Sequence, residues 1–127
     1  MKKLILSFAV LAALLLPGTA RAGCWSTVGL DSMPKAGHPA SKPWVVTIRV
    51  LQHGRTPMPD ARPVVRIRNA AGELYRFKGK PTGVVGSYRA RVVFPAAGLY
   101  KLGVYDGFPH SQCARVHAFK SVLVEDV

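Results

Sequence analysis

Hydrophobic and polar residues alternate with a period of two along most of the chain after residue 24. The alternation is clearest in residues 44–52, where Val46, Ile48 and Val50 share one side and Thr47 and Arg49 share the other. Gly, Pro, Asn or Asp interrupts the pattern every eight to twelve residues. No segment after the N-terminal stretch shows the 3.6-residue period of an amphipathic helix. The pattern therefore predicts short β-strands joined by turns.

Seven segments carry the strand pattern, and no helical segment that could serve as a crossover lies between them. The segments are residues 25–30, 44–52, 64–69, 74–78, 87–94, 99–105 and 115–124. Strands without helical crossovers are expected to pair antiparallel. We therefore predict an all-β fold, a seven-stranded antiparallel immunoglobulin-like β-sandwich, in which two sheets enclose the apolar side of every strand. A closed barrel is the alternative that strand spacing does not separate from it.

The first 22 residues have the pattern of a secretory signal peptide. Lys2 and Lys3 precede an apolar run at residues 4–16, and Ala20-Arg21-Ala22 follows it as a cleavage site. The run is too short to span a bilayer comfortably. We predict a signal peptide at residues 1–22 and one β-sandwich domain at residues 23–127, without a transmembrane segment after cleavage. The protein would then be periplasmic or secreted, and a lipoprotein attached through Cys24 is the alternative.

The predicted mature chain is strongly basic. The full sequence has 18 Lys and Arg residues against 6 Asp and Glu residues, and removal of Lys2, Lys3 and Arg21 leaves 15 against 6, a net charge of +9. An exported location argues against nucleic acid as the partner. We expect an envelope protein or an anionic surface instead, with solubility alone as the simpler explanation of the charge.

The two cysteines, Cys24 and Cys113, lie near the two ends of the predicted mature chain. Disulfides form and persist outside the cytoplasm, so we predict a bridge between them. It would close a loop of about 90 residues and stabilise the fold by about 4 to 5 kcal/mol in the chain-entropy treatment. Two unrelated thiols are the alternative.

Three motifs together resemble a known family. They are Trp25-Ser26-Thr27-Val28 leading to Met33-Pro34, then Gln52-His53-Gly54-x-Thr56-Pro57, and then the pattern G-x-Y-x-A-x-V-x-F-P-x-x-G at residues 86–98. In this respect the chain resembles the YtkA-like extracytoplasmic bacterial domains, which are similar to the FixH-like group. The resemblance covers residues 25–106. It implies an immunoglobulin-like sandwich that serves as an accessory or binding module, and it implies no catalytic residues.

No set of residues with a recognisable catalytic role is present. The sequence lacks a G-x-S-x-G nucleophile elbow, a papain-like cysteine motif and a Gly-rich phosphate loop before a helix. Its carboxylates are scattered, and only Glu125 and Asp126 are adjacent. We therefore predict that the protein is not an enzyme and that it has no catalytic residues.

Copper binding is the alternative function, because imidazole and thioether groups suit the two oxidation states of copper. The candidate ligands are His38, His53, Met58 and His110, and His53 and His110 would approach each other if loops at one end of a sandwich converge. Their spacing lacks the tightness of a strong metal motif, so we predict no resident cofactor, with copper as the alternative.

Arginines alternate with apolar residues on two of the predicted strands. Arg66 and Arg68 lie on one strand, and Arg89 and Arg91 lie on another. Further basic residues nearby in the sequence are Arg49, Arg76, Lys78 and Lys80. If the two strands share a sheet, its outer face is a candidate contact for an anionic surface, and that binding would weaken as salt rises. The simpler interpretation is that these side chains keep sheet faces soluble and protect strand edges.

Overall fold

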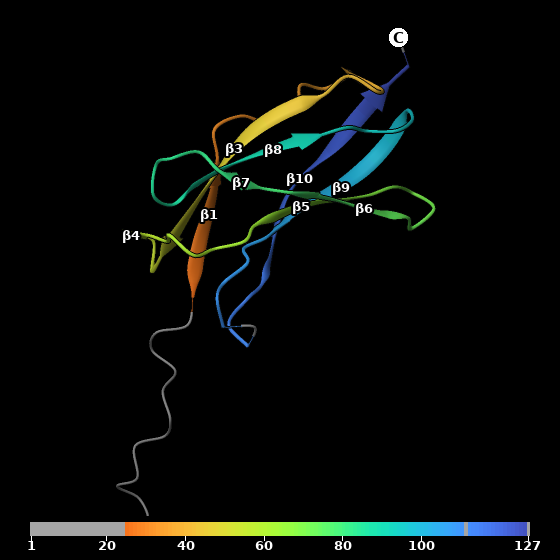
Figure 1. Ribbon diagram of the computed structural model, residues 1–127. Helices are drawn as coiled ribbons and strands as arrows, with labels where there is room; N and C mark the ends of the chain where they lie inside the picture. Colours follow the sequence, from red (N-terminus) through yellow and green to blue (C-terminus); the bar gives the residue numbers. More distant parts are fainter. Residues whose placement is uncertain (1–24, 111, 127) are drawn as a thin grey trace, which may run out of the picture.

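The computed structural model describes residues 25–110 and 112–126, and these residues form β-strands, turns and connecting segments without a helix (Figure 1). The predicted signal peptide and Cys24 lie outside the described residues. The described residues contain no helical segment that could span a lipid bilayer.

Ten strands occur in the described ranges. In chain order they are β1 Ser26–Leu30, β2 His38–Pro39, β3 Trp44–Gln52, β4 Thr56–Pro57, β5 Val64–Arg68, β6 Leu74–Lys78, β7 Lys80–Pro81, β8 Ser87–Val92, β9 Gly98–Tyr105 and β10 Val116–Glu125. The seven strands of five or more residues lie in the seven segments that the alternation predicts, with ends that differ by at most two residues. The all-β prediction is therefore confirmed.

The strands form two sheets that face each other. Sheet A has the order β1-β3-β8-β7, with β4 also paired to β3, and sheet B has the order β2-β10-β9-β5-β6. All pairings are antiparallel except that of β2 with β10. This arrangement is two packed sheets rather than a closed barrel.

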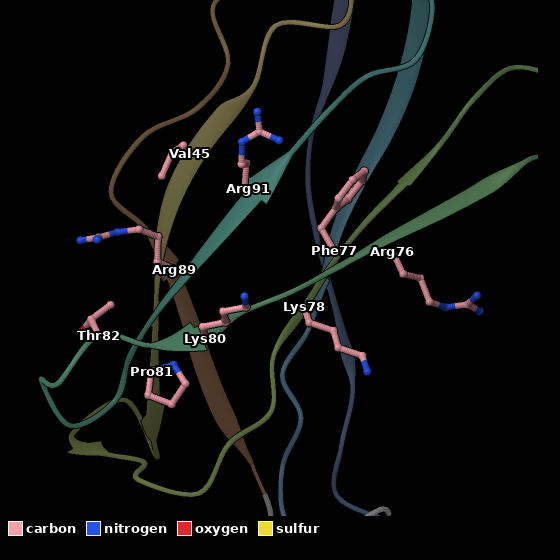
Figure 2. A pocket seen from close by; sticks show the side chains of 9 residues that line it. All are labelled: Val45, Arg76, Phe77, Lys78, Lys80, Pro81, Thr82, Arg89 and Arg91. Atoms are coloured by element: carbon pink, nitrogen blue, oxygen red, sulfur yellow. The ribbon is translucent and has the colours of Figure 1, made fainter.

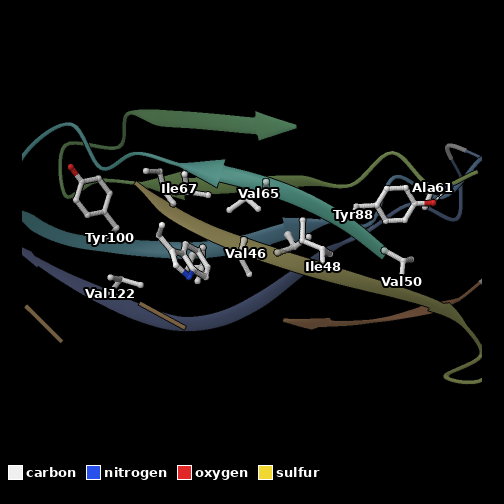
Figure 3. Close-up of a cluster of buried hydrophobic side chains, with 14 of the residues drawn as sticks. Val46, Ile48, Val50, Ala61, Val65, Ile67, Tyr88, Tyr100 and Val122 are labelled. Carbon is white, nitrogen blue, oxygen red and sulfur yellow. Dashed lines mark hydrogen bonds between the residues drawn. The ribbon is translucent and has the colours of Figure 1, made fainter. Parts of the chain in front are cut away.

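The apolar side of each long strand points between the sheets, as the period-two pattern requires. Figure 3 shows side chains of β3 and β5 meeting there, among them Val46, Ile48, Val65 and Ile67, all 0% exposed. The core continues with Tyr88, Ala90, Val92 and Phe94, and with Tyr100, Leu102, Val104, Val122 and Val124. Phe94 and Tyr100 contact each other edge to face, with ring centroids 5.1 Å apart. Burial of these residues provides the main driving force of the fold.

The chain passes from sheet B to sheet A at Gly79. β6 ends at Lys78 as the edge strand of sheet B, and β7 begins at Lys80 as the edge strand of sheet A. The Gly79 N–H donates to the Pro63 carbonyl at 2.8 Å. A Cβ at this position would lie 3.1 Å from Pro63 Cγ and 3.2 Å from Tyr88 Cβ. Glycine therefore permits a close crossing between the two sheet edges.

A buried carboxylate also links the two sheets. Asp106, at the end of β9, is 1% exposed. Its Oδ2 accepts a 2.8 Å hydrogen bond from Ser26 Oγ of β1 and lies 2.9 Å from His117 Nε2 of β10. Its Oδ1 accepts from the amides of Phe108 and Arg115 at 3.0 and 3.2 Å. One side chain thus joins β1 in sheet A to β9, β10 and their connecting loop in sheet B.

Candidate anion-binding cleft

A basic cleft lies beside the crossing at Gly79. It has a volume of about 690 Å³, which is within the usual range of ligand pockets. The lining residues are Val45, Arg76, Phe77, Lys78, Lys80, Pro81, Thr82, Arg89 and Arg91. Five of the nine are Arg or Lys and none is Asp or Glu, so the cleft concentrates positive charge.

The cleft is formed by strands of both sheets. Figure 2 shows β8 and β6 diverging from the region of β7, with Arg91 on β8 and Phe77 on β6. Arg76 and Lys78 come from β6 and point away from β8 in Figure 2, toward the outer face of sheet B, whereas Lys80 comes from β7. Lys80 pairs directly with Arg89 of β8, and Arg91 pairs with Val45 of β3. Three strands of sheet A and the edge strand of sheet B therefore contribute to one cleft.

The five cationic side chains of the cleft are exposed, whereas Phe77 is half-buried. Exposed cations keep most of their hydration, so each contributes modestly to binding, and the effect depends on several acting together. Val45, 52% exposed, and Phe77 add apolar surface between the charges. The cleft is therefore suited to a ligand that carries several negative charges and some apolar surface.

The structure places the four predicted anion contacts on different sheets. Arg66 and Arg68 belong to β5 in sheet B, and Arg89 and Arg91 belong to β8 in sheet A. The alternate residues of both strands fill the core between the sheets, so the two pairs point to opposite outer faces. The prediction of one basic sheet face with all four arginines required both strands to lie in one sheet, and they lie in different sheets. Arg89 and Arg91 line the basic cleft, while Arg66 and Arg68 line a separate depression on sheet B with Lys101.

The predicted copper ligands do not come together as one group. His38 pairs in register with Val124 near the end of β10, and the loop with His110 precedes the start of β10 at Val116. The position of His38 and the loop with His110 are therefore about eight strand residues, or about 26 Å, apart, and the two histidines are too far apart to bind one metal ion. His38 Nε2 lies 2.7 Å from the Lys42 carbonyl oxygen, within hydrogen-bonding distance.

The other three candidates lie toward the opposite end of the sandwich. His53 stacks on Trp25, with ring centroids 5.1 Å apart, and its Nε2 is buried without a hydrogen-bond partner. Met58 is part of the core at 6% exposed. Met58 and His110 line one depression of about 320 Å³. Among residues 25–110 and 112–126, no group of three or more His, Cys, Asp or Glu side chains could hold a metal ion.

The structure reveals a polar cluster that the sequence pattern did not indicate. Ser26, Asp106 and His117 are a serine, a carboxylate and a histidine in contact, but Ser26 donates to Asp106 rather than to the histidine. The arrangement therefore differs from a Ser-His-Asp triad, in which the histidine lies between the other two. No local motif joins positions 26, 106 and 117, because the cluster forms only when the two sheets pack against each other.

The predicted disulfide has one partner in the described part of the chain. Cys113 is 7% exposed and lies in the loop before β10, and there is no free cysteine among the described residues. Because Cys24 lies outside those residues, the bridge between the two stays a prediction.

Comparisons with known proteins find similarity in solved structures alone. No protein-family model and no curated protein sequence matches the chain. Two structures of a superoxide reductase (neelaredoxin) from Ignicoccus hospitalis are similar to it at 13% identity. In the first, the TM-score is 0.48 with 82% of this chain and 83% of that chain covered, and in the second it is 0.44 with 78% and 80% covered.

The prediction that this protein is not an enzyme is corrected by these neighbours, because both are enzymes by name. The absence of hydrolase and nucleotide-binding motifs was too narrow a basis, since many chemistries are grafted onto β-sandwich folds without them. At this identity and TM-score the neighbours assign no reaction, substrate or metal to the chain.

Proposed function

We propose that this protein is an exported binding module that takes an anionic ligand or partner in the basic cleft at residues 45, 76–78, 80–82, 89 and 91. The single observation that carries the proposal is the composition of the cleft, which has five Arg or Lys side chains and no carboxylate over a volume of about 690 Å³. Like charges gathered at one place repel each other, and an anionic ligand relieves that repulsion.

We infer an immunoglobulin-like, seven-stranded sandwich as the scaffold of this module. The sheet order supports the inference: β1-β3-β8-β7 corresponds to an A-B-E-D sheet, and β10-β9-β5 corresponds to a G-F-C sheet. The signal-like pattern of residues 1–22 supports export, and the motifs at residues 25–28, 52–57 and 86–98 support kinship with the YtkA-like domains. Such modules expose loops and strand edges on a rigid scaffold, where recognition residues concentrate.

Isothermal titration calorimetry of the predicted mature protein, residues 23–127, with a short inorganic polyphosphate tests the proposed function. We expect saturable binding that weakens as salt rises from 50 to 300 mM, since exposed charges are screened over about 8 Å at physiological ionic strength. The double variant Arg89→Glu/Arg91→Glu should reduce the affinity about tenfold or more, because it turns two attractive contacts into repulsive ones.

A matched control separates the cleft from net charge. Arg68 and Lys101 are exposed, pair in register on sheet B and line the other basic depression. The double variant Arg68→Glu/Lys101→Glu changes the net charge equally and should leave the affinity within about threefold. Equal losses in both double variants, or no binding by the wild type, would contradict the proposed function.

A further inference from the structure

The edge of β8 is open where the basic cleft lies. β7 covers only two positions of β8, through the pairs Lys80 with Arg89 and Pro81 with Tyr88. β8 itself continues to Val92. Beyond Arg89, no strand in the described part of the chain pairs with β8 on this side. An unpaired strand edge is a template for one more strand.

The backbone of Arg91 faces this open edge. The carbonyl of Gly86 accepts from Val50 of β3 at 2.9 Å, whereas the carbonyl of Ser87 accepts from Thr82 on the other side at 3.2 Å. Successive residues of a strand direct their backbone groups to opposite neighbours, so residues 87, 89 and 91 face the β7 side. At Arg91, β7 has already ended and the chain has crossed to sheet B through Gly79.

The side chains around the open edge specify what an added strand must carry. Arg91 and Arg89 point to the outer face of sheet A, and Lys80 pairs with Arg89 there. A residue placed opposite Arg91 would project to the same outer face, where an acidic side chain meets a cation. Its two neighbours would project to the other side, where the cleft is lined by the half-buried Phe77.

From this geometry we infer that the cleft binds an extended peptide segment in which acidic and apolar residues alternate, added as a strand to the edge of β8 at Arg91. Main-chain hydrogen bonds to the N–H and C=O of Arg91 align the segment, and alternate side chains give it specificity. This inference rests on the proposed function, because it names the class of anionic partner for the same cleft. The charge complementarity is between the acidic positions of the segment and the cations that share the outer face of sheet A with them, Lys80, Arg89 and Arg91.

The test uses a fluorescein-labelled peptide of sequence Ser-Val-Glu-Val-Glu-Val-Glu-Ser and two N-methylated forms. When the peptide pairs antiparallel with β8, the glutamate side chains lie on the same outer face of sheet A as Arg91, and the glutamate amides point toward β8. The valine amides point away from β8. We expect N-methylation of the glutamates to weaken binding, measured by fluorescence anisotropy, by about tenfold or more, the effect of losing one to two hydrogen bonds. N-methylation of the valines, which adds the same number of methyl groups, should change it by less than about threefold.

Hydrogen–deuterium exchange locates the added strand. The peptide should slow amide exchange in residues 89–94, whereas polyphosphate should bind without slowing it there. Equal binding of the two methylated peptides, or protection of β6 in place of β8, would overturn the inference. If polyphosphate binds and the peptide does not, the inference fails and the proposed function stands. If neither ligand binds, both fail.

Discussion

Replacement of Asp106 by asparagine probes the link between the two sheets with little change of shape. Asp106 is 1% exposed and holds four hydrogen-bonding contacts, with Ser26 Oγ, His117 Nε2 and the amides of Phe108 and Arg115. An asparagine can still accept from the two amides through its oxygen. Its NH₂ group replaces the oxygen that faces Ser26 and His117, so the serine must turn to become an acceptor.

The expected loss follows from the change of acceptor. Hydrogen bonds to a charged group contribute about 1.5 to 3 kcal/mol each, and neutral ones about 0.5 to 1.5 kcal/mol. The two amide bonds survive in neutral form, at a loss of about 1 kcal/mol each by this comparison. Rearrangement at Ser26 and His117 adds a smaller amount. We therefore expect Asp106→Asn to lower the free energy of unfolding at pH 7 by about 2 to 3 kcal/mol, a large part of the usual 5 to 15 kcal/mol.

The pH dependence gives the second half of this prediction. Burial raises the pKa of Asp106, but the hydrogen bonds from His117, the Phe108 amide, Ser26 and the Arg115 amide together outweigh it and hold the pKa below its ordinary value of 3.8. A carboxylate with a lowered pKa in the folded state stabilises the fold above its unfolded pKa. That contribution disappears as the pH falls below about 4 and through the folded pKa. The wild type should therefore lose its advantage over Asp106→Asn in strong acid.

Urea unfolding at pH 7, 5 and 3, followed by the fluorescence of the buried Trp44, measures both effects. With a slope of about 1 to 3 kcal/mol per molar urea, the midpoint should fall by about 1 to 2 M at pH 7 and by less at pH 3. Asp31→Asn is the control, because the exposed Asp31 carboxylate accepts a single amide bond, from Thr47 at 2.9 Å. A loss for Asp106→Asn that equals the control at pH 7, or that is as large at pH 3 as at pH 7, would refute the reasoning.

Two further substitutions test the loops that hold the sheets together, each against a matched control. Gly107→Ala should destabilise the protein by more than about 3 kcal/mol in the same assay, because φ of Gly107 is +64° and a Cβ there would overlap the backbone of Arg62. The control is Gly72→Ala, which should cost about 1 kcal/mol, because Gly72 has φ +85° but lies in open space. Similar losses for the two would contradict the overlap. The Tyr88 hydroxyl donates to the Met58 carbonyl at 2.6 Å and accepts from the Ala61 amide at 3.1 Å. Tyr88→Phe should therefore lower the free energy of unfolding by about 1 to 3 kcal/mol and speed proteolysis in residues 53–62. Tyr75→Phe, which removes one exposed 3.2 Å bond to Glu73, should stay within about 0.5 kcal/mol, and an equal loss there would count against the role of the buried hydroxyl.

The long strands could be predicted from the sequence because their signal is local. In β3 the residues that alternate in hydropathy are the ones that alternate in burial, so Val46, Ile48 and Val50 are fully buried while Arg49 is exposed. The three two-residue strands could not be predicted in this way. Each of them ends in a proline, at Pro39, Pro57 and Pro81, which supplies no N–H to a ladder. These strands are set by the tertiary position of the chain rather than by their own pattern.

The basic residues of the cleft were visible in the sequence, but their grouping was not. Arg76, Lys78 and Lys80 occupy alternate positions, so a continuous strand would place them on one face of one sheet. The structure divides them between two sheets at Gly79. The Asp106 cluster was hidden for a related reason, since positions 26 and 106 are joined by packing of the two sheets across 80 residues of chain.

The crossing at Gly79 is what keeps the basic cleft open. Lys80 pairs with Arg89, so a chain that continued along sheet A in the same register would place Lys78 directly opposite Arg91. That strand would cover the open edge of β8 and set two cations side by side, which is unfavourable for a cross-strand pair. Instead, the Gly79 N–H bonds to Pro63 and the preceding residues pair with β5 in sheet B. On the β7 side, no strand in the described part of the chain therefore pairs with the backbone of Arg91, which lies beside Lys80 and Arg89, so the feature that joins the two sheets at this edge also creates the proposed recognition site.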